Sequence, residues 1–383
     1  MNLADMLSYA DIQSLSAIAK HYNCECSTNS KHELIQAILN AVNRKDVVEQ
    51  TIESLSETDL KFLNTFLFEQ RELCTLEELI ARVVQVRSSS IPAEPAAEET
   101  EIKPRQIVSK YKERGWLFNG VNAKTKYLFQ FPKDLKDKFG DTLQRKFERG
   151  LAYTGDPAYY RDYHLLILDD VLVFLNYVNK EEIRLTSDGV PYKRQLQQML
   201  EMMNVPEELP GKTAWRFGYG RKYKFYPERF SLIYDYCYYN EYILEQEDQL
   251  MLSDKGLSKV QRGEKDSLVD MYRFWLRLYK NPIYNLPAIV HWVNRLAHDW
   301  VTVQSLKKVL CPYIKKFYYD SPEDIFAYRI LKMMQYLGLV RIGGNQASEE
   351  PVPEDAVVQM TDIGKKVIRG IYVHDDETIP LLE

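Results

Sequence analysis

The chain has 383 residues, of which 45% are hydrophobic and 27% are charged. This balance is that of folded globular protein and excludes a mainly disordered or low-complexity chain, while the length predicts two to four domains. The formal net charge of −5 excludes a uniformly basic protein, so any nucleic-acid contact has to come from a local basic patch.

Residues 1–48 predict a small helical module. Ile12, Leu15 and Ile18 lie on one face of a first helix, and Ser30 with Glu33 has capping-box spacing at the start of a second. Two short helices around a polar loop resemble the SAP and Rho N-terminal modules, in which a lysine, here Lys31, precedes the Glu-Leu-Ile of the second helix. This resemblance implies nucleic-acid contact, and the alternative is a purely structural N-terminal cap.

The sequence pattern of residues 49–150 predicts three helices followed by a hairpin, which is the element order of a winged helix. Ser56 and Thr75 have the spacing of N-caps for the first two helices. Segment 88–104 is acidic and nearly free of large apolar residues, which predicts a flexible insertion. The third helix is predicted to end at Gly115, before the hairpin.

The same pattern recurs in residues 151–262, with a basic and aromatic insertion at 205–227, and in residues 263–383, which include a C-terminal tail. A hairpin is predicted across 242–253. Segments 250–260 and 358–368 share a Ser/Thr–Asp–x–Gly frame after an apolar strand, with Ser253 and Thr361 as N-cap candidates. The predicted fold is therefore mainly α with small β hairpins: tandem winged-helix units after a SAP/Rho-N-like module.

A strand, an Asp-Gly turn and a basic helix start follow one another in the second winged-helix unit. The residues are Leu185, Thr186, Asp188, Gly189, Lys193 and Arg194. This frame resembles the helicase-associated tandem winged-helix proteins of bacteria, which are related to the N-terminal domain of XPB-type helicases. The resemblance implies an accessory protein of DNA repair or transcription. Since the chain has no helicase motif, the motor would be a separate partner chain.

Sequence motifs of catalysis are absent from the chain. It has no phosphate-binding glycine loop, no HExxH and no GxSxG, and its six histidines are scattered. The five cysteines are odd in number and form no CxxC, which predicts reduced thiols, and neither a signal peptide nor an 18-residue apolar run is present. We therefore predict a non-enzymatic cytoplasmic protein with no catalytic residue, metal, cofactor or membrane contact.

Charge is distributed unevenly along the chain. Residues 46–101 carry a net charge of −9, whereas residues 103–149 carry +8 and include the third helix and the wing of the first winged helix. A winged helix places these elements against nucleic-acid backbone, so five cations are predicted phosphate contacts. They are Lys110, Lys112, Arg114, Lys124 and Lys126. The alternative is a solvated helix face and loop.

A second basic segment, residues 212–230, carries a net charge of +5 and interleaves its cations with aromatic residues. This composition suits a surface that follows the backbone of a nucleic acid and stacks on its bases. The predicted contacts are Lys212, Arg216, Arg221, Lys222, Tyr223 and Lys224. The alternative is a segment that packs its aromatics inside and extends its cations into solvent.

These patterns together predict a nucleic-acid-linked accessory or scaffold protein. It would bind DNA, single-stranded DNA included, or RNA, and would partner a helicase, a polymerase or other transcription or repair machinery. The alternative is a protein-interaction adaptor whose winged helices do not bind nucleic acid, which the overall acidity favours.

Overall fold

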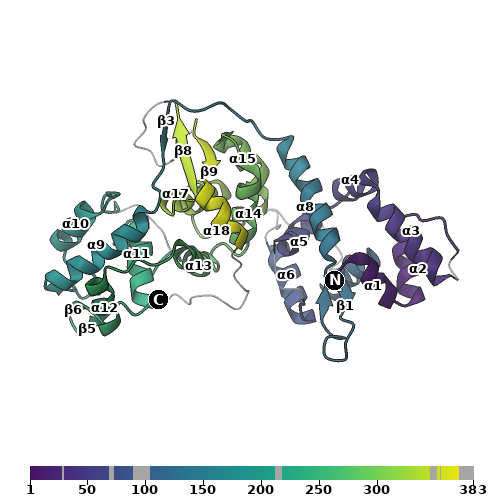
Figure 1. Cartoon of the computed structure of the whole chain (residues 1–383), viewed down its shortest axis with the longest axis horizontal. Coiled ribbons are helices and arrows are strands. Elements are labelled where there is room, and N and C mark those ends of the chain that lie inside the picture. The colour runs from purple at the N-terminus through teal and green to yellow at the C-terminus, as the bar shows by residue number, and fades with distance from the viewer. Residues whose placement is uncertain are drawn as a thin grey trace. The chain divides into compact units, whose positions relative to one another are not determined.

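The computed structural model describes residues 1–27, 30–68, 73–88, 104–211, 218–345, 352–353 and 355–370 (Figure 1). These residues form mainly helices with small antiparallel sheets, which confirms the predicted mainly α class. The chain divides into two compact units, with the boundary after Arg149. The predicted insertion 88–104 lies almost entirely outside the described residues.

The first unit begins with four helices. Ser30 caps the third of them through the Glu33 N–H, as predicted, and the apolar residues Leu15, Ile18 and Leu34 are buried. Lys31 donates to the Ser8 carbonyl oxygen at 2.7 Å, so its ammonium holds two helices together. The helices are α1 (Leu3–Tyr9), α2 (Ile12–His21), α3 (Lys31–Asn43) and α4 (Lys45–Glu53).

The remainder of the first unit is three helices, a two-stranded hairpin and a closing helix. Ser56 and Thr75 accept hydrogen bonds from the N–H groups of Asp59 and Glu78, which confirms both predicted caps. Helix α2 packs on α7 and α4 on α8, so the N-terminal helices share one compact unit with this part. The elements are α5 (Glu57–Leu67), α6 (Leu76–Ser88), α7 (Pro104–Glu113), β1 (Phe118–Asn119), β2 (Phe129–Gln130) and α8 (Lys133–Glu148).

The second unit opens with a strand and then repeats the helix and hairpin pattern. Helices α9, α10, α11 and α12 gather around the small sheet β4-β6-β5 (Figure 1). The hairpin predicted across 242–253 is confirmed, since Ile243 pairs with Leu252. The elements are β3 (Tyr159–Arg161), α9 (Leu166–Lys180), β4 (Ile183–Arg184), α10 (Lys193–Met202), α11 (Glu228–Tyr239), β5 (Ile243–Gln246), β6 (Gln249–Leu252) and α12 (Asp254–Arg262).

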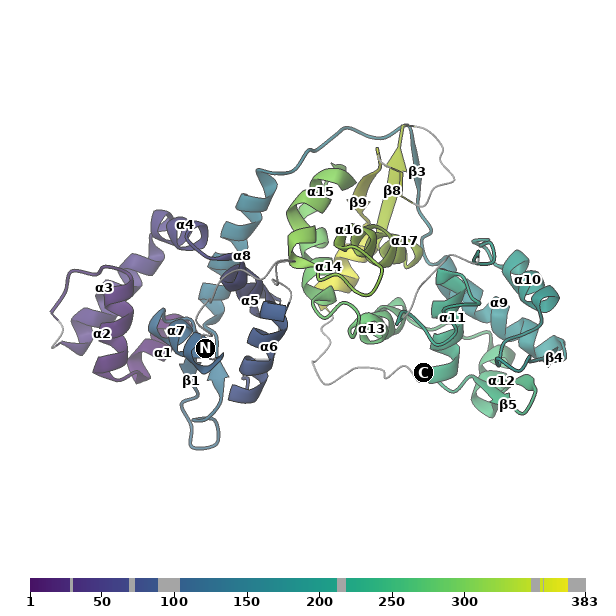
Figure 2. The same ribbon diagram turned by 180° about the vertical axis from the view of Figure 1, so that it is seen from behind.

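The second unit closes with a further copy of the pattern around the sheet β3-β8-β9-β7 (Figure 2). Segments α16, η2 and α17 follow one another without a break, and η2 has π-helical geometry. The elements are α13 (Leu268–Tyr279), α14 (Leu286–Leu296), β7 (Val301–Thr302), α15 (Val303–Leu310), η1 (Cys311–Tyr313), α16 (Pro322–Asp324), η2 (Ile325–Leu331), α17 (Lys332–Tyr336), β8 (Val340–Gly344), β9 (Val357–Met360) and α18 (Asp362–Gly370).

One order of elements therefore occurs three times: helix, short strand, helix, helix, hairpin and closing helix. We name the copies the first repeat (56–148), the second repeat (166–262) and the third repeat (286–370). In each copy the short first strand pairs with the last strand of the hairpin. In the first repeat that short strand is the single bridge from Cys74 to Phe129.

The third helix ends in the same way in all three repeats. A left-handed residue follows the helix, and the next N–H donates to the carbonyl five residues earlier, as in a Schellman motif. The left-handed residues are Gly115, Glu241 and Gly338, with φ of 66°, 59° and 69°. The following bonds are Trp116 N–H to Tyr111 O, Tyr242 N–H to Cys237 O, and Leu339 N–H to Met334 O, at 2.8–2.9 Å.

The Ser/Thr–Asp–x–Gly frame has one structural role in the second and third repeats. Ser253 and Thr361 accept hydrogen bonds from the N–H groups of Gly256 and Gly364, which confirms both predicted caps. A Cβ on Gly256 would lie 2.0 Å from the Tyr242 carbonyl oxygen, and one on Gly364 would lie 2.2 Å from that of Leu339. The frame thus requires glycine, because the closing helix starts in contact with the backbone of the hairpin.

Candidate nucleic-acid interface

Two predicted phosphate contacts, Lys110 on helix α7 and Arg114 directly after it, are engaged inside the first repeat. The carboxylate of Asp59, on α5, accepts hydrogen bonds from Lys110 Nζ at 2.8 and 3.0 Å and from the Tyr111 hydroxyl at 2.7 Å. Arg114 Nη1 lies 3.3 Å from Asp59 Oδ2, and its guanidinium is 5.0 Å from the ring of Trp116. These cations hold α7 on α5.

The partners of Asp59 stabilise the charged form of its carboxyl group. Burial raises the pKa of its carboxyl, but the hydrogen bonds from Lys110 and Tyr111 and the charge of Arg114 more than offset that effect and lower the pKa. The Arg114 side chain is 16% exposed and that of Lys110 is 44% exposed. A phosphate role for Arg114 does not fit this geometry, because its charge already neutralises a buried carboxylate.

The other three predicted contacts of the first repeat remain at the surface. Lys112, Lys124 and Lys126 are exposed. Lys112 Nζ donates to Asn119 Oδ1 at 3.0 Å, and Asn119 Nδ2 donates to the Lys126 carbonyl oxygen at 2.9 Å. Helix α7 and the hairpin loop predicted to be the wing, residues 120–128 (here called the wing loop), are thus tied together with their lysines on the outside.

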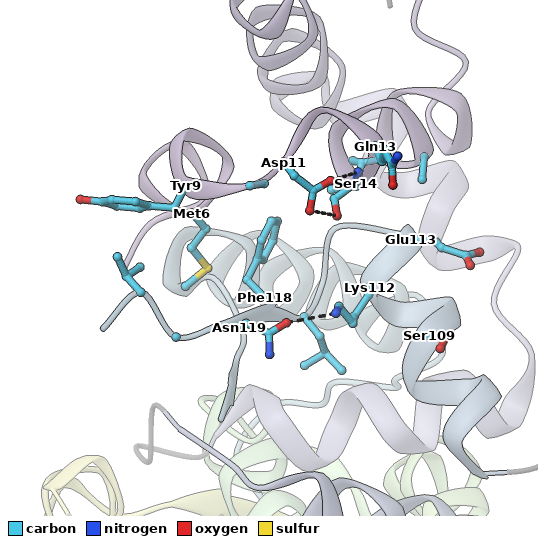
Figure 3. A pocket seen from close by; sticks show the side chains of 16 residues that line it. Met6, Tyr9, Asp11, Gln13, Ser14, Ser109, Lys112, Glu113, Phe118 and Asn119 are labelled. Carbon is cyan, nitrogen blue, oxygen red and sulfur yellow. Dashed lines mark hydrogen bonds between the residues drawn. The ribbon is translucent and has the colours of Figure 1, made fainter. Parts of the chain in front are cut away.

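A polar groove of about 560 Å³ runs beside this corner (Figure 3). Tyr9 and Asp11, from α1 and the start of α2, line one side. Lys112, Phe118 and Asn119, from α7 and β1, line the other. Aromatic, acidic and basic groups are mixed in the groove, so its own charge pattern does not select an anion.

The predicted contacts of the second basic segment are partly buried. Arg221 makes two hydrogen bonds to the Glu245 carboxylate, at 2.9 and 3.2 Å, and its guanidinium lies 3.4 Å from the centre of the Tyr238 ring. Its side chain is 9% exposed. A phosphate role for Arg221 therefore does not fit the structure, because the charge is already paired and shielded from solvent.

Of the neighbouring residues in this segment, some contact the rest of the fold and others are exposed. Lys222 donates to the Asp188 carbonyl oxygen at 2.6 Å and so contacts the predicted Asp188–Gly189 turn. Lys224 is exposed, with its Nζ 5.7 Å from the ring of Tyr223, which is half-buried. Lys212 and Arg216 lie outside the described residues. The nearby rings of Tyr219 and Tyr226 are buried, as the packing alternative predicts.

In a winged helix bound to DNA, the third helix of the fold enters the groove. Helix α11 is the third helix of the second repeat, and nine of its consecutive residues, 229–237, are buried. The segment Pro322–Tyr336 of the third repeat is also mostly buried, with Glu323 and Tyr328 exposed. These helices have no broad free face for a groove, whereas α7 exposes several polar side chains.

A basic and aromatic strip in the third repeat, residues 307–319, was not predicted from the sequence as a site. It contains four lysines and no acidic residue. Lys308, Lys315 and Lys316 are exposed, as are Tyr318 and Tyr319. Composition could have found this strip, because it interleaves cations and aromatics as segment 212–230 does.

Within the described ranges, no helix is long and apolar enough to cross a membrane, and no three His, Cys, Asp or Glu side chains gather as a metal site. Comparison of the chain with protein-family models, curated proteins and solved structures finds no match.

Proposed function

We propose that the three repeats are winged helices and that the chain is a non-enzymatic scaffold that contacts duplex DNA through the first repeat. Support for the winged-helix assignment is the order of elements and the pairing of the first strand with the last, which recur in each repeat. The fold alone carries no function, so the argument for DNA rests on the surface of the first repeat.

One observation carries this proposal: three exposed lysines stand on the corner formed by α7 and the wing loop. The bonds from Lys112 through Asn119 to the Lys126 backbone hold helix and wing in a fixed relation. Cations on a helix and on a loop that is tied to that helix suit contacts to phosphates on either side of a groove. The contact would be electrostatic and independent of base sequence.

The test is a charge-reversal triple variant, Lys112→Glu, Lys124→Glu and Lys126→Glu. Duplex affinity of the full chain, measured by fluorescence anisotropy from 50 to 200 mM salt, should fall strongly. If three phosphates are released, the slope of log affinity against log salt should become shallower by about 2.7. A matched triple variant at exposed lysines elsewhere, Lys20→Glu, Lys45→Glu and Lys180→Glu, changes the net charge equally and should bind nearly as the wild type. Equal losses in both variants would contradict the proposal.

A second function, a protein-interaction adaptor, is favoured by the second and third repeats. Their third helices are buried against other helices of the same unit rather than exposed. If the wild-type chain binds no duplex even at 50 mM salt, the adaptor function replaces the first proposal.

A further inference from the structure

The strip 307–319 meets the second basic segment in space, although about ninety residues separate them along the chain. The ring of Phe317 lies 5.7 Å from that of Tyr219 in an edge-on contact, and Gly218 leaves room for it. Tyr219 is buried while Tyr318 and Tyr319 are 60% and 78% exposed. Among the described residues of the two segments, the most exposed aromatic side chains thus belong to the strip.

Tyr318 and Tyr319 form the centre of a two-residue turn. Phe317 and Asp320 exchange backbone hydrogen bonds at 3.0 and 3.2 Å across it. The φ of Tyr318 is 49°, in the left-handed region where glycine, asparagine or aspartate is usual in such turns. A bulky residue at this position costs conformational energy, and such strain persists only where the surroundings hold it.

The surroundings hold both ends of the turn. The guanidinium of Arg329 donates to the two carboxylate oxygens of Asp320, at 2.8 and 3.4 Å, and contacts Glu228 on α11. The Arg329 side chain is 9% exposed, so this clamp is inside the unit. Phe317 anchors the other end on Tyr219. A rigid support therefore presents two tyrosine rings to solvent.

The charge around these rings selects a class of partner. Lys308, Lys315 and Lys316 are exposed in the same strip, and Lys307 is half-exposed. Protein interfaces deplete lysine at their centres, whereas surfaces for single-stranded nucleic acid combine cations for the phosphates with aromatic rings for the bases. In a duplex the base faces are already stacked, so exposed rings gain little there.

We propose that the turn at Tyr318–Tyr319, with the lysines of strip 307–319, binds single-stranded nucleic acid by base stacking. This site lies in the third repeat and is distinct from the duplex contact proposed for the first repeat. Its two functional parts are separable: the rings supply stacking, and the lysines supply phosphate contacts. The chemistry is shared by DNA and RNA, and the probes below distinguish the two sources.

The experiment measures binding of the full chain to fluorescein-labelled dT12 and U12 by anisotropy at 50 mM salt. Tyr319→Ala should weaken binding about tenfold, as expected for one lost stacked base. Lys315→Glu with Lys316→Glu should also weaken binding and make the salt slope shallower by about 1.4. The matched control is Tyr192→Ala, since Tyr192 is 55% exposed and precedes Lys193 and Arg194 but is not held in such a turn.

The left-handed backbone conformation of Tyr318 allows a further test of the proposal. Tyr318→Asn removes a ring but places a residue that tolerates the left-handed region, so its melting temperature should equal or exceed that of the wild type while its affinity falls. The proposal is supported if the wild type binds dT12 or U12 and these variants lose affinity. The oligomer that binds more tightly identifies DNA or RNA as the ligand.

The proposal is overturned if the wild type binds neither oligomer, or if Tyr192→Ala loses as much affinity as Tyr319→Ala. It is also overturned if single-strand binding is lost in the first-repeat lysine variant and kept in Tyr319→Ala. If the wild type still binds duplex DNA in any of these cases, the function proposed for the first repeat is unaffected. Failure of the single-strand proposal is therefore distinguishable from failure of the duplex proposal.

Discussion

Asp170 on α9 and Arg229 on α11 form a buried ion pair. Removing either partner alone should strongly destabilise the second unit. Their side chains are 0% and 1% exposed, and Arg229 Nη2 lies 2.5 Å from Asp170 Oδ2. The other carboxylate oxygen accepts from the backbone N–H and the side-chain amide of Asn204, at 2.7 and 2.6 Å. Neither charge can reach water if its partner is lost.

Three variants measure this coupling. Arg229→Met keeps the side-chain volume, and Asp170→Asn keeps an acceptor for Asn204, so each removes mainly one charge. Each should destabilise the second unit by about 3–5 kcal/mol, because a buried charge remains unpaired. The double variant leaves no buried charge of this pair, so it should cost less than the sum of the single variants by at least about 2 kcal/mol.

The assay is urea unfolding followed by tryptophan fluorescence, since Trp275 and Trp292 are buried in the second unit. The units can unfold in separate transitions, so the transition of the second unit is the one to compare. Single variants that each cost less than about 1 kcal/mol would refute the reasoning, as would a double variant whose cost equals the sum.

Two further predictions concern the first unit and the hairpin corners. Because the pKa of Asp59 is lowered on folding, its contribution to stability is complete above the unfolded pKa of about 3.9 and is lost as the pH falls through the folded pKa. The stability difference between wild type and Asp59→Asn, measured by urea unfolding at pH 7, 5 and 3, should therefore be constant from pH 7 to 5 and smaller at pH 3; a difference that grows at pH 3 would contradict this sign. Gly256→Ala and Gly364→Ala should each destabilise the second unit by about 1–3 kcal/mol, because the methyl group meets a backbone carbonyl oxygen. In the same urea titration Gly155→Ala, where nothing lies within 4 Å of the added Cβ, should change stability by no more than about 0.5 kcal/mol, and equal effects at all three sites would refute the steric argument.

The sequence predicted the features that depend on neighbours along the chain. The caps at Ser30, Ser56, Thr75, Ser253 and Thr361 and the hairpin across 242–253 are local, so short motifs identify them. The amphipathic periodicity that places Leu15 and Leu34 in the core is also readable within one helix.

The candidate interface was harder to predict, because a cation's role depends on distant carboxylates. Asp59 lies more than fifty residues from Lys110 and Arg114, and Glu245 lies 24 residues from Arg221. A positive net charge over a segment therefore could not separate cations that hold the fold from those that remain at the surface. The left-handed turn at Tyr318 has no glycine or asparagine to reveal it in the sequence.

Helix α11 has a consequence for how the second unit can be divided. It packs on α9 of its own repeat and on α13 and α17 beyond it, and its residues 229–237 are buried on every side. A fragment that ends at residue 262 would uncover the apolar faces that α13 and α17 protect, so the second repeat cannot be excised as an autonomous domain. The second and third repeats should accordingly behave as one cooperative folding unit, whose innermost amides open to hydrogen exchange only when the whole unit unfolds.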